Sequence, residues 1–258
     1  MPDVSATTVP EKKPKSPITW GPVAAIAVTI IIYFGAQFFG GLVILLVSRL
    51  LGVQHDQVSK WLEQVGPQFF FILLVEGATL GALWLFLRSR KANFKTLGLV
   101  KPHWIDLGWV CIGFGIYFPL LIGSMALLKL WFPEINMNQQ QQIGFQGAHS
   151  LALVPVFISL VVFPPFAEEL LTRGFLFLGL RTKLPMIAAA LLTSLIFASA
   201  HLQAGSGAPL LWTAALDTFM LSLVLIFLRQ KTGRLWSSIG LHMVKNSLAF
   251  MALFIFIS

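Results

Sequence analysis

The stretch LALVPVFISLVVFPPFAEELLTR, residues 151–173, decides both the fold and the class of this chain. It is apolar over most of its length, and an α-helix needs about 20 predominantly apolar residues to cross the hydrocarbon core of a bilayer. Near its end it carries Glu168, Glu169 and Arg173. Ionised groups cost about 3 kcal/mol or more each inside a membrane, so they are retained where they pair or line a wet cavity. The stretch therefore predicts a membrane helix that contributes to a polar site.

The composition of the whole chain agrees with a membrane protein. Of its 258 residues, 57% are hydrophobic and 11% are charged, whereas soluble domains have about 45–50% apolar and about 25% charged residues. The apolar residues gather in runs at about 22–51, 67–87, 104–131, 151–180, 185–201, 209–228 and 235–258. We expect an all-α, polytopic transmembrane helical bundle of about seven spans, or eight if the over-long first run hides a broken helix.

The domain organisation follows from the same pattern. Residues 1–19 are polar and contain Pro10, Pro14 and Pro17, which predicts a disordered cytoplasmic tail. Residues 20–258 form a single transmembrane domain, with the residues for chemistry at about 151–257. The first apolar run is far longer than the apolar region of a signal peptide, which has about 7–15 residues.

The net charge of +8 comes from an excess of basic residues, and their placement indicates how the chain is oriented in the membrane. Lysines and arginines cluster at the ends of apolar runs, so the positive-inside rule places the N-terminus in the cytoplasm and the C-terminus outside. No basic stripe with interleaved aromatic residues is present, so we expect no nucleic-acid partner. The pattern suits an integral protein of a bacterial-type plasma membrane.

Cys111 is the only cysteine and lies inside an apolar run. An intrachain disulfide is therefore excluded. We expect Cys111 to be a buried, inert small side chain rather than a nucleophile.

The acidic pair has a helical spacing that gives its members different roles. Residues four apart share a helix face, so Glu169 is the natural ion-pair partner of Arg173. Glu168 then points elsewhere and can act as a general base on water, although a purely structural ion pair is the alternative. The preceding Pro164 and Pro165 remove two backbone donors and predict a break or kink beside a water-filled pocket.

Two further groups complete a candidate hydrolytic site. His201 ends the stretch that starts at Phe197, and it is either a metal ligand or a partner of the base. His242 and Asn246 lie four residues apart, so both can reach one point, where they could hold an oxyanion or, for the imidazole, zinc. Polar helix–helix contacts are the alternative. At a helical rise of about 1.5 Å per residue, His242 is expected close to the membrane surface and His201 deeper in the membrane. The two side chains can therefore meet only if the fifth run starts late or tilts.

The three motifs Glu-Glu-x-x-x-Arg (168–173), Phe-x-x-x-His (197–201) and His-x-x-x-Asn (242–246) lie in this order on successive apolar runs. In this order they resemble the CAAX protease and bacteriocin-processing family, also called the type II CAAX prenyl endopeptidase or Abi family. The resemblance covers about residues 151–257, and Leu97-Gly98-Leu99 is also similar to a segment of that family. It implies an intramembrane endopeptidase that acts on membrane-associated protein or peptide substrates, prenylated or not.

The resemblance also implies a role for each motif residue. Glu168 matches the catalytic glutamate, Glu169 and Arg173 its supporting pair, and His201 the second catalytic position. His242 and Asn246 match the residues proposed to hold an oxyanion or a metal. Two mechanisms stay open. Zinc bound by His201, His242 and Glu168 would lower the pKa of its bound water towards about 7. In the other mechanism, Glu168 and His201 activate water without a metal. The expected partners are membrane lipid and a protein or peptide substrate, and the sequence predicts no oligomeric state.

Other functions and other charged residues are also considered. A non-catalytic immunity or scaffold protein of the same fold is one alternative. A proton-coupled transporter is another, but it predicts internal repeats that the sequence lacks. Glu76 and Asp217 are expected to make supporting or helix–helix contacts, and Lys245 either snorkels to the membrane edge or pairs with Asp217.

Overall fold

The structure is a computed structural model that describes residues 18–137, 139, 144–145, 148–203 and 209–256. Within these residues all regular structure is helical, and the following segments are long and apolar enough to cross a membrane: α1 (Pro22–Leu50), α3 (Val65–Ser89), α4 (Trp104–Trp131), Ser150–Arg181, α9 (Trp212–Thr232) and Trp236–Phe256. The shorter α8 (Met186–Ser199) is a further apolar helix. The predicted all-α polytopic bundle is thus confirmed. The first run is one continuous helix, so the eight-span alternative is not realised, and the expected tail lies outside the described residues except for 18–19.

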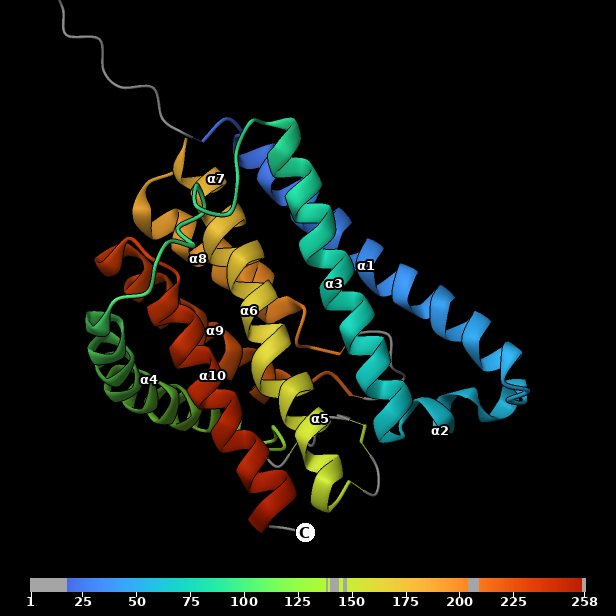
Figure 1. The fold of residues 1–258 in the computed structure, drawn as a ribbon. Coiled ribbons are helices and arrows are strands. Elements are labelled where there is room, and N and C mark those ends of the chain that lie inside the picture. Colours follow the sequence, from blue (N-terminus) through green and yellow to red (C-terminus); the bar gives the residue numbers. More distant parts are fainter. Residues whose placement is uncertain (1–17, 138, 140–143, 146–147, 204–208, 257–258) are drawn as a thin grey trace, which may run out of the picture.

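The helices pack around the segment Ser150–Arg181, which runs through the middle of the bundle (Figure 1). It comprises η2 (Ser150–Ala152), α5 (Leu153–Phe157), η3 (Ile158–Val162), α6 (Phe163–Glu169), η4 (Leu170–Leu176) and α7 (Phe177–Arg181). Its η4 part is buried at every position. On one side it contacts α1 and α3, which are joined by η1 (His55–Gln57) and α2 (Val58–Leu62), and on the other it contacts α8 and α10 (Trp236–Met251, continued by η5, Ala252–Phe256). This central position brings its acidic pair into reach of four neighbouring helices.

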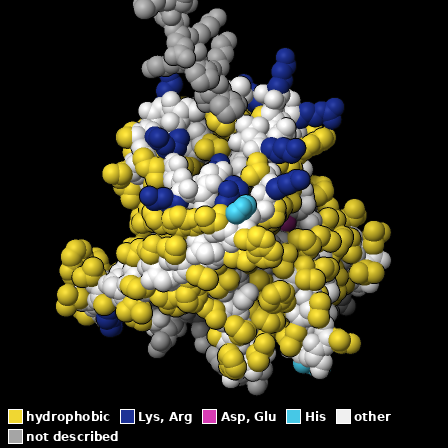
Figure 2. Space-filling view, turned by 60° about the vertical axis from the view of Figure 1, so that its left-hand side comes forward, with side chains coloured by type: hydrophobic (Ala, Val, Ile, Leu, Met, Phe, Trp, Pro, Cys, Tyr) yellow, Lys and Arg dark blue, Asp and Glu magenta, His cyan; other side chains and the backbone are white. Residues whose placement is uncertain are grey.

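The outer faces of the helices are as apolar as the core. Only 22% of the most apolar window of α1 is buried, and a broad belt of apolar side chains crosses the face of the molecule that Figure 2 shows. Cys111 belongs to this outer surface of α4, so the prediction that it is buried was wrong. The reason is physical: lipid tails are as apolar as a protein core, so an apolar run does not distinguish the inward face of a membrane helix from its outward face.

The proline pair does not break the central segment, so of the predicted break or kink the break is wrong. A π-helical stretch, η3, precedes it, and the segment then continues as α6. The Leu160 carbonyl would accept from residue 164 in an α-helix or from residue 165 in a π-helix, and both are prolines without an N–H. Asn246 replaces the missing donor, because its Nδ2 donates to Leu160 O at 2.9 Å. A side chain from α10 therefore compensates for the defect.

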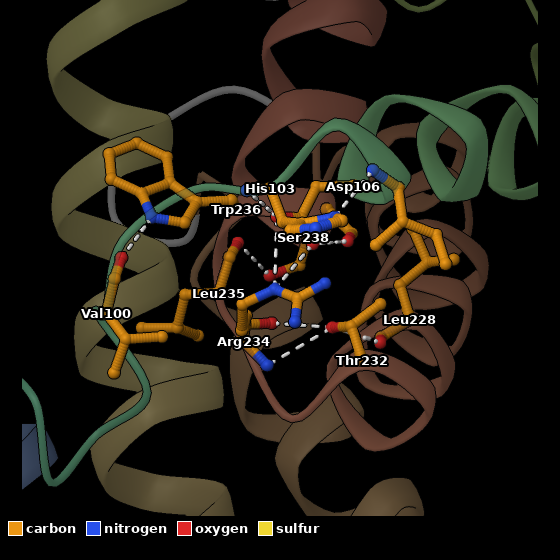
Figure 3. A network of polar contacts seen from close by, with 11 residues as sticks. Val100, His103, Asp106, Leu228, Thr232, Arg234, Leu235, Trp236 and Ser238 are labelled. Carbon is orange, nitrogen blue, oxygen red and sulfur yellow. Dashed lines mark hydrogen bonds and ion pairs between the residues drawn. The ribbon is translucent and has the colours of Figure 1, made fainter.

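The beginning of α10 is covered by the connection between α3 and α4 (Figure 3). Asp106, in the first turn of α4, accepts from Arg234 Nε at 3.0 Å and from Ser237 Oγ at 2.9 Å. Trp236 Nε1 donates to the carbonyl of Val100 at 2.5 Å. These contacts fix the start of α10 to the start of α4, and they bury the first turn of α10 beneath the connection.

The same connection contains Leu97-Gly98-Leu99. Gly98 has φ +99°, and a Cβ there would lie 2.6 Å from Nη2 of the buried Arg229. Arg229 Nη2 in turn donates to the carbonyl of Leu97 at 3.0 Å. A glycine is required here both by the backbone conformation and by the close approach of the guanidinium group.

Candidate active site

The predicted ion pair lies at the centre of the site. Arg173 Nη1 is 2.8 Å from Glu169 Oε1, and both side chains are completely buried. The Arg173 guanidinium also lies over the Phe197 ring, with Cζ 4.2 Å from the ring centroid, which adds a cation–π contact. A charge in such a place requires a partner, because an unpaired buried ion is strongly destabilising.

His242 connects the two carboxylates. Its Nδ1 lies 3.2 Å from Glu169 Oε1, and its Nε2 lies 3.8 Å from Glu168 Oε2. A carboxylate can only accept, so the contact with Glu169 puts a proton on Nδ1 and turns Nε2 towards Glu168. The buried pair thereby fixes the orientation of the imidazole.

Glu168 faces a cavity of about 340 Å³ that α1, α3, α8 and the central segment enclose. Its side chain is 29% exposed, whereas that of the neighbouring Glu169 is fully buried. The helical offset between adjacent residues produces this difference. Glu168 is therefore the carboxylate that water and a substrate can reach.

His201 lines the same cavity from the end of α8. Its Nδ1 donates to the carbonyl of Phe197 at 2.9 Å, since a carbonyl oxygen can only accept. The Phe197 ring centroid is 4.9 Å from that of His201 and 6.0 Å from that of His242. The two imidazoles therefore both contact one aromatic ring, and the depth difference expected from residue counting does not separate them. Two features account for this: α8 has only 14 residues, and α10 begins beneath a covering segment.

Asn246 is placed differently from the other motif residues. It lies one turn beyond His242 on α10, and its contact is with the Leu160 carbonyl. It is not among the described residues that line the cavity. The structure thus brings Glu168, Glu169, Arg173, His201 and His242 together, and it gives Asn246 a contact with the backbone of the central segment.

The donor set does not form a metal centre in the described part of the chain. No three side chains of His, Cys, Asp or Glu are gathered there closely enough to hold a metal ion. The expected zinc ligands His201, His242 and Glu168 share the site, but they do not form a three-ligand group. No step of the chemistry below is therefore assigned to zinc.

Several polar residues near the site were not predicted to line a cavity. Thr29 and Tyr33 from α1 and Glu76 and Thr79 from α3 face it. Glu76 had stood out as an acid within an apolar run, whereas threonine and tyrosine in membrane helices give little signal. The predicted pair of Lys245 with Asp217 is confirmed at 3.0 Å. The hydroxyl of Tyr117 also donates to Asp217, so this group links α4, α9 and α10.

These observations define an integral, polytopic helical membrane protein with a charged site that faces an internal cavity. Residues 150–248 match the model of a protein family described as type II CAAX prenyl endopeptidase Rce1-like. This segment contains every motif residue from Glu168 to Asn246, so the part of the chain that carries the motifs is similar to the Rce1-like family, and the match supports a protease in general terms. No curated protein and no solved structure matches the chain.

Proposed function

We propose that the protein is an intramembrane endopeptidase that hydrolyses peptide bonds with a water molecule activated by Glu168. One observation carries the proposal. Glu168 is the accessible carboxylate of the Glu168–Glu169 pair, and it lines the cavity. It lies 3.8 Å from Nε2 of His242, and Nδ1 of the same imidazole is held by the buried Glu169–Arg173 pair. An accessible base beside an oriented imidazole is the arrangement that general-base catalysis requires.

The reaction then proceeds in two proton transfers. Glu168 takes a proton from water as the oxygen attacks the scissile carbonyl carbon, and a tetrahedral intermediate forms. When the carbon–nitrogen bond breaks, Glu168 returns that proton to the departing nitrogen. His242 positions Glu168 and the water, and His201 faces the same volume from α8. Enclosure of the site strengthens these interactions, because the local dielectric constant is low.

The substrate class that the family description suggests is a prenylated protein with a C-terminal CAAX sequence. An internally quenched peptide that carries a farnesylated cysteine and such a C-terminus is the appropriate probe, in detergent or in proteoliposomes. The same peptide without the farnesyl group tests the lipid requirement, and we expect cleavage of the lipidated form to be faster.

The decisive variants are Glu168→Gln and Glu168→Ala. Each should reduce cleavage by at least about 100-fold, because general-base catalysis contributes about 10²–10⁴. Glu134→Gln is the matched control, since Glu134 is exposed and lies outside the cavity. Cleavage at the wild-type rate by Glu168→Gln would overturn the proposal.

A metal chelator distinguishes the two mechanisms. The metal-free mechanism proposed here predicts the same cleavage rate with and without 1,10-phenanthroline. If the chelator abolishes cleavage and added zinc restores it, the water is activated by a metal instead, and His201 and His242 become its expected ligands.

A further inference from the structure

The wall of the cavity opposite Glu168 comes from two helices that the family match does not include. α1 contributes Thr29 and Tyr33, and α3 contributes Glu76 and Thr79. Their spacings of four and three residues put each pair on one helix face. Other faces of α1 are apolar and outward: Ile31 and Phe38, for example, are more than half exposed. Polar groups on these helices thus face the cavity, at membrane depth.

The polar groups of this wall have no hydrogen-bond partner among the residues that the structure describes. Thr29 is 5% exposed, and its Oγ1 has no hydrogen-bond partner among the described residues. No residue that the structure describes forms an ion pair or hydrogen bond with Glu76, whose carboxylate lies near enough to Glu168 for the two to repel. The Tyr33 phenol lies within electrostatic range of both carboxylates. A buried polar group without a partner is destabilising, so a ligand that supplies the missing hydrogen bonds would be stabilised here.

The wall also offers free hydrogen-bond donors and an acceptor, whereas the corresponding groups of the motif residues are already engaged. The Nδ1–H groups of His201 and His242 are engaged by Phe197 and Glu169, and the amide of Asn246 is engaged by Leu160. Hydroxyl groups on α1 and α3 remain as donors, and Glu76 remains as an acceptor. A peptide main chain in extended form offers both carbonyl acceptors and N–H donors, so it complements this set.

We propose that Thr29, Tyr33, Glu76 and Thr79 form a main-chain binding wall for the substrate peptide. In this arrangement the hydroxyl groups donate to substrate carbonyl oxygens, and Glu76 accepts from a substrate N–H. The peptide is thereby held across the cavity with its scissile carbonyl towards Glu168. This inference rests on the proposed function, and it extends the site to helices α1 and α3.

Binding to an inactive protein tests the wall directly. The probe is a dye-labelled peptide with a farnesylated cysteine and a CAAX C-terminus, measured by fluorescence anisotropy with the Glu168→Gln protein. Thr29→Val, Tyr33→Phe and Glu76→Leu in that background should each weaken binding about three- to tenfold, as expected for one lost hydrogen bond. Thr193→Val is the matched control, because the Thr193 hydroxyl is also buried without a described partner but does not line the cavity.

The outcomes separate this inference from the proposed function. Weaker binding for the wall variants, with Thr193→Val within twofold of its parent, supports the wall. Equal binding by all variants overturns it, and so does a parent protein that does not bind the peptide. Cleavage of the same peptide by the wild-type protein tests the proposed function separately. If the Glu168→Gln protein binds the peptide but the wild-type protein does not cleave it, only the proposed peptidase activity is contradicted. If the wild-type protein cleaves the peptide and the wall variants bind it as tightly as their parent, only the wall is contradicted. Thermal unfolding identifies any variant that fails to fold, and Tyr33→Phe, which removes one oxygen, is then the deciding variant.

Discussion

Glu169 holds two charged or polar partners with the same oxygen atom. Its Oε1 accepts from Arg173 Nη1 at 2.8 Å and from His242 Nδ1 at 3.2 Å. Because Glu169 and Arg173 are fully buried, each depends on the other for charge compensation. The adjacent Glu168 has a different role only because a helix turns its side chain to another direction. One residue step thus separates the structural carboxylate from the proposed catalytic one.

Substitution of the two glutamates should therefore have unequal effects on stability. Glu169→Gln leaves the buried Arg173 without a counter-charge, and we expect it to lower the free energy of unfolding by about 3–5 kcal/mol. Glu168→Gln should change it by less than about 1 kcal/mol, because Glu168 is partly exposed to the cavity. Thermal unfolding of both proteins in the same detergent measures the difference.

A double substitution separates the contribution of the Glu169–Arg173 pair to stability from its contribution to catalysis. Glu169→Leu combined with Arg173→Met removes both charges, and replacing a buried ion pair by apolar residues is often neutral or stabilising. We expect this protein to unfold near the wild-type temperature but to cleave poorly, because His242 loses its orienting carboxylate. An active double variant would show that the pair is needed only for folding.

Among the elements, the sequence predicts the extents of α1 and α4 but not the contacts of the central segment. The apolar runs expected at 104–131 and 22–51 correspond to α4 (Trp104–Trp131) and α1 (Pro22–Leu50), because hydropathy reports the length of a membrane helix directly. The proline pair was misjudged, since local rules say which donors are lost but not which distant side chain replaces them. Asn246 lies far along the chain, and only the packing of α10 against η3 brings it to Leu160.

The contact of Asn246 predicts coupling with the proline pair. Asn246→Ala leaves the Leu160 carbonyl without its donor, and we expect a loss of about 1–3 kcal/mol of unfolding free energy. Pro164→Ala supplies an N–H at the position from which an α-helix would satisfy that carbonyl. The same Asn246→Ala change should therefore cost less in the Pro164→Ala background, which a double-mutant cycle of unfolding measurements would detect.

Cleavage assays on these proteins give a second readout. If Asn246 acts only through the backbone of the central segment, the protein with both substitutions regains activity together with stability. A stable but inactive double variant would instead assign Asn246 a part in the chemistry, such as the oxyanion contact that the family resemblance implies. Equal costs in both backgrounds would contradict the structural role of the Leu160 contact.

At the scale of the whole molecule, the site combines residues that the sequence pattern reveals with residues that it does not reveal. Charged and imidazole groups in apolar runs are costly and therefore conspicuous, so Glu168, His201 and His242 could be predicted to belong to one site. Thr29 and Tyr33 are inexpensive in a membrane helix, and nothing local distinguishes them from other residues of α1. Their place in the cavity depends on how α1 packs against α3 and the central segment, which the pattern of a single chain does not specify.

The distribution of charge over the molecule predicts its orientation in the membrane. Lysines and arginines gather at one end of the apolar belt (Figure 2), and the positive-inside rule predicts that this end is cytoplasmic. The connection after α3 lies at that end, whereas the connection between α1 and α3 lies at the other (Figure 1). The C-terminal end of α10 is also opposite to the basic end, so it should lie outside.

Cysteine labelling tests this orientation. Cys111 is first replaced by Ala, which removes the only native thiol and should be tolerated, because the side chain lies on the apolar outer face of α4. Lys91→Cys places a thiol at the predicted cytoplasmic end, and Gln57→Cys places one between α1 and α3. In intact cells a membrane-impermeant maleimide should label Gln57→Cys but not Lys91→Cys, and after permeabilisation it should label both. The reverse pattern would invert the topology.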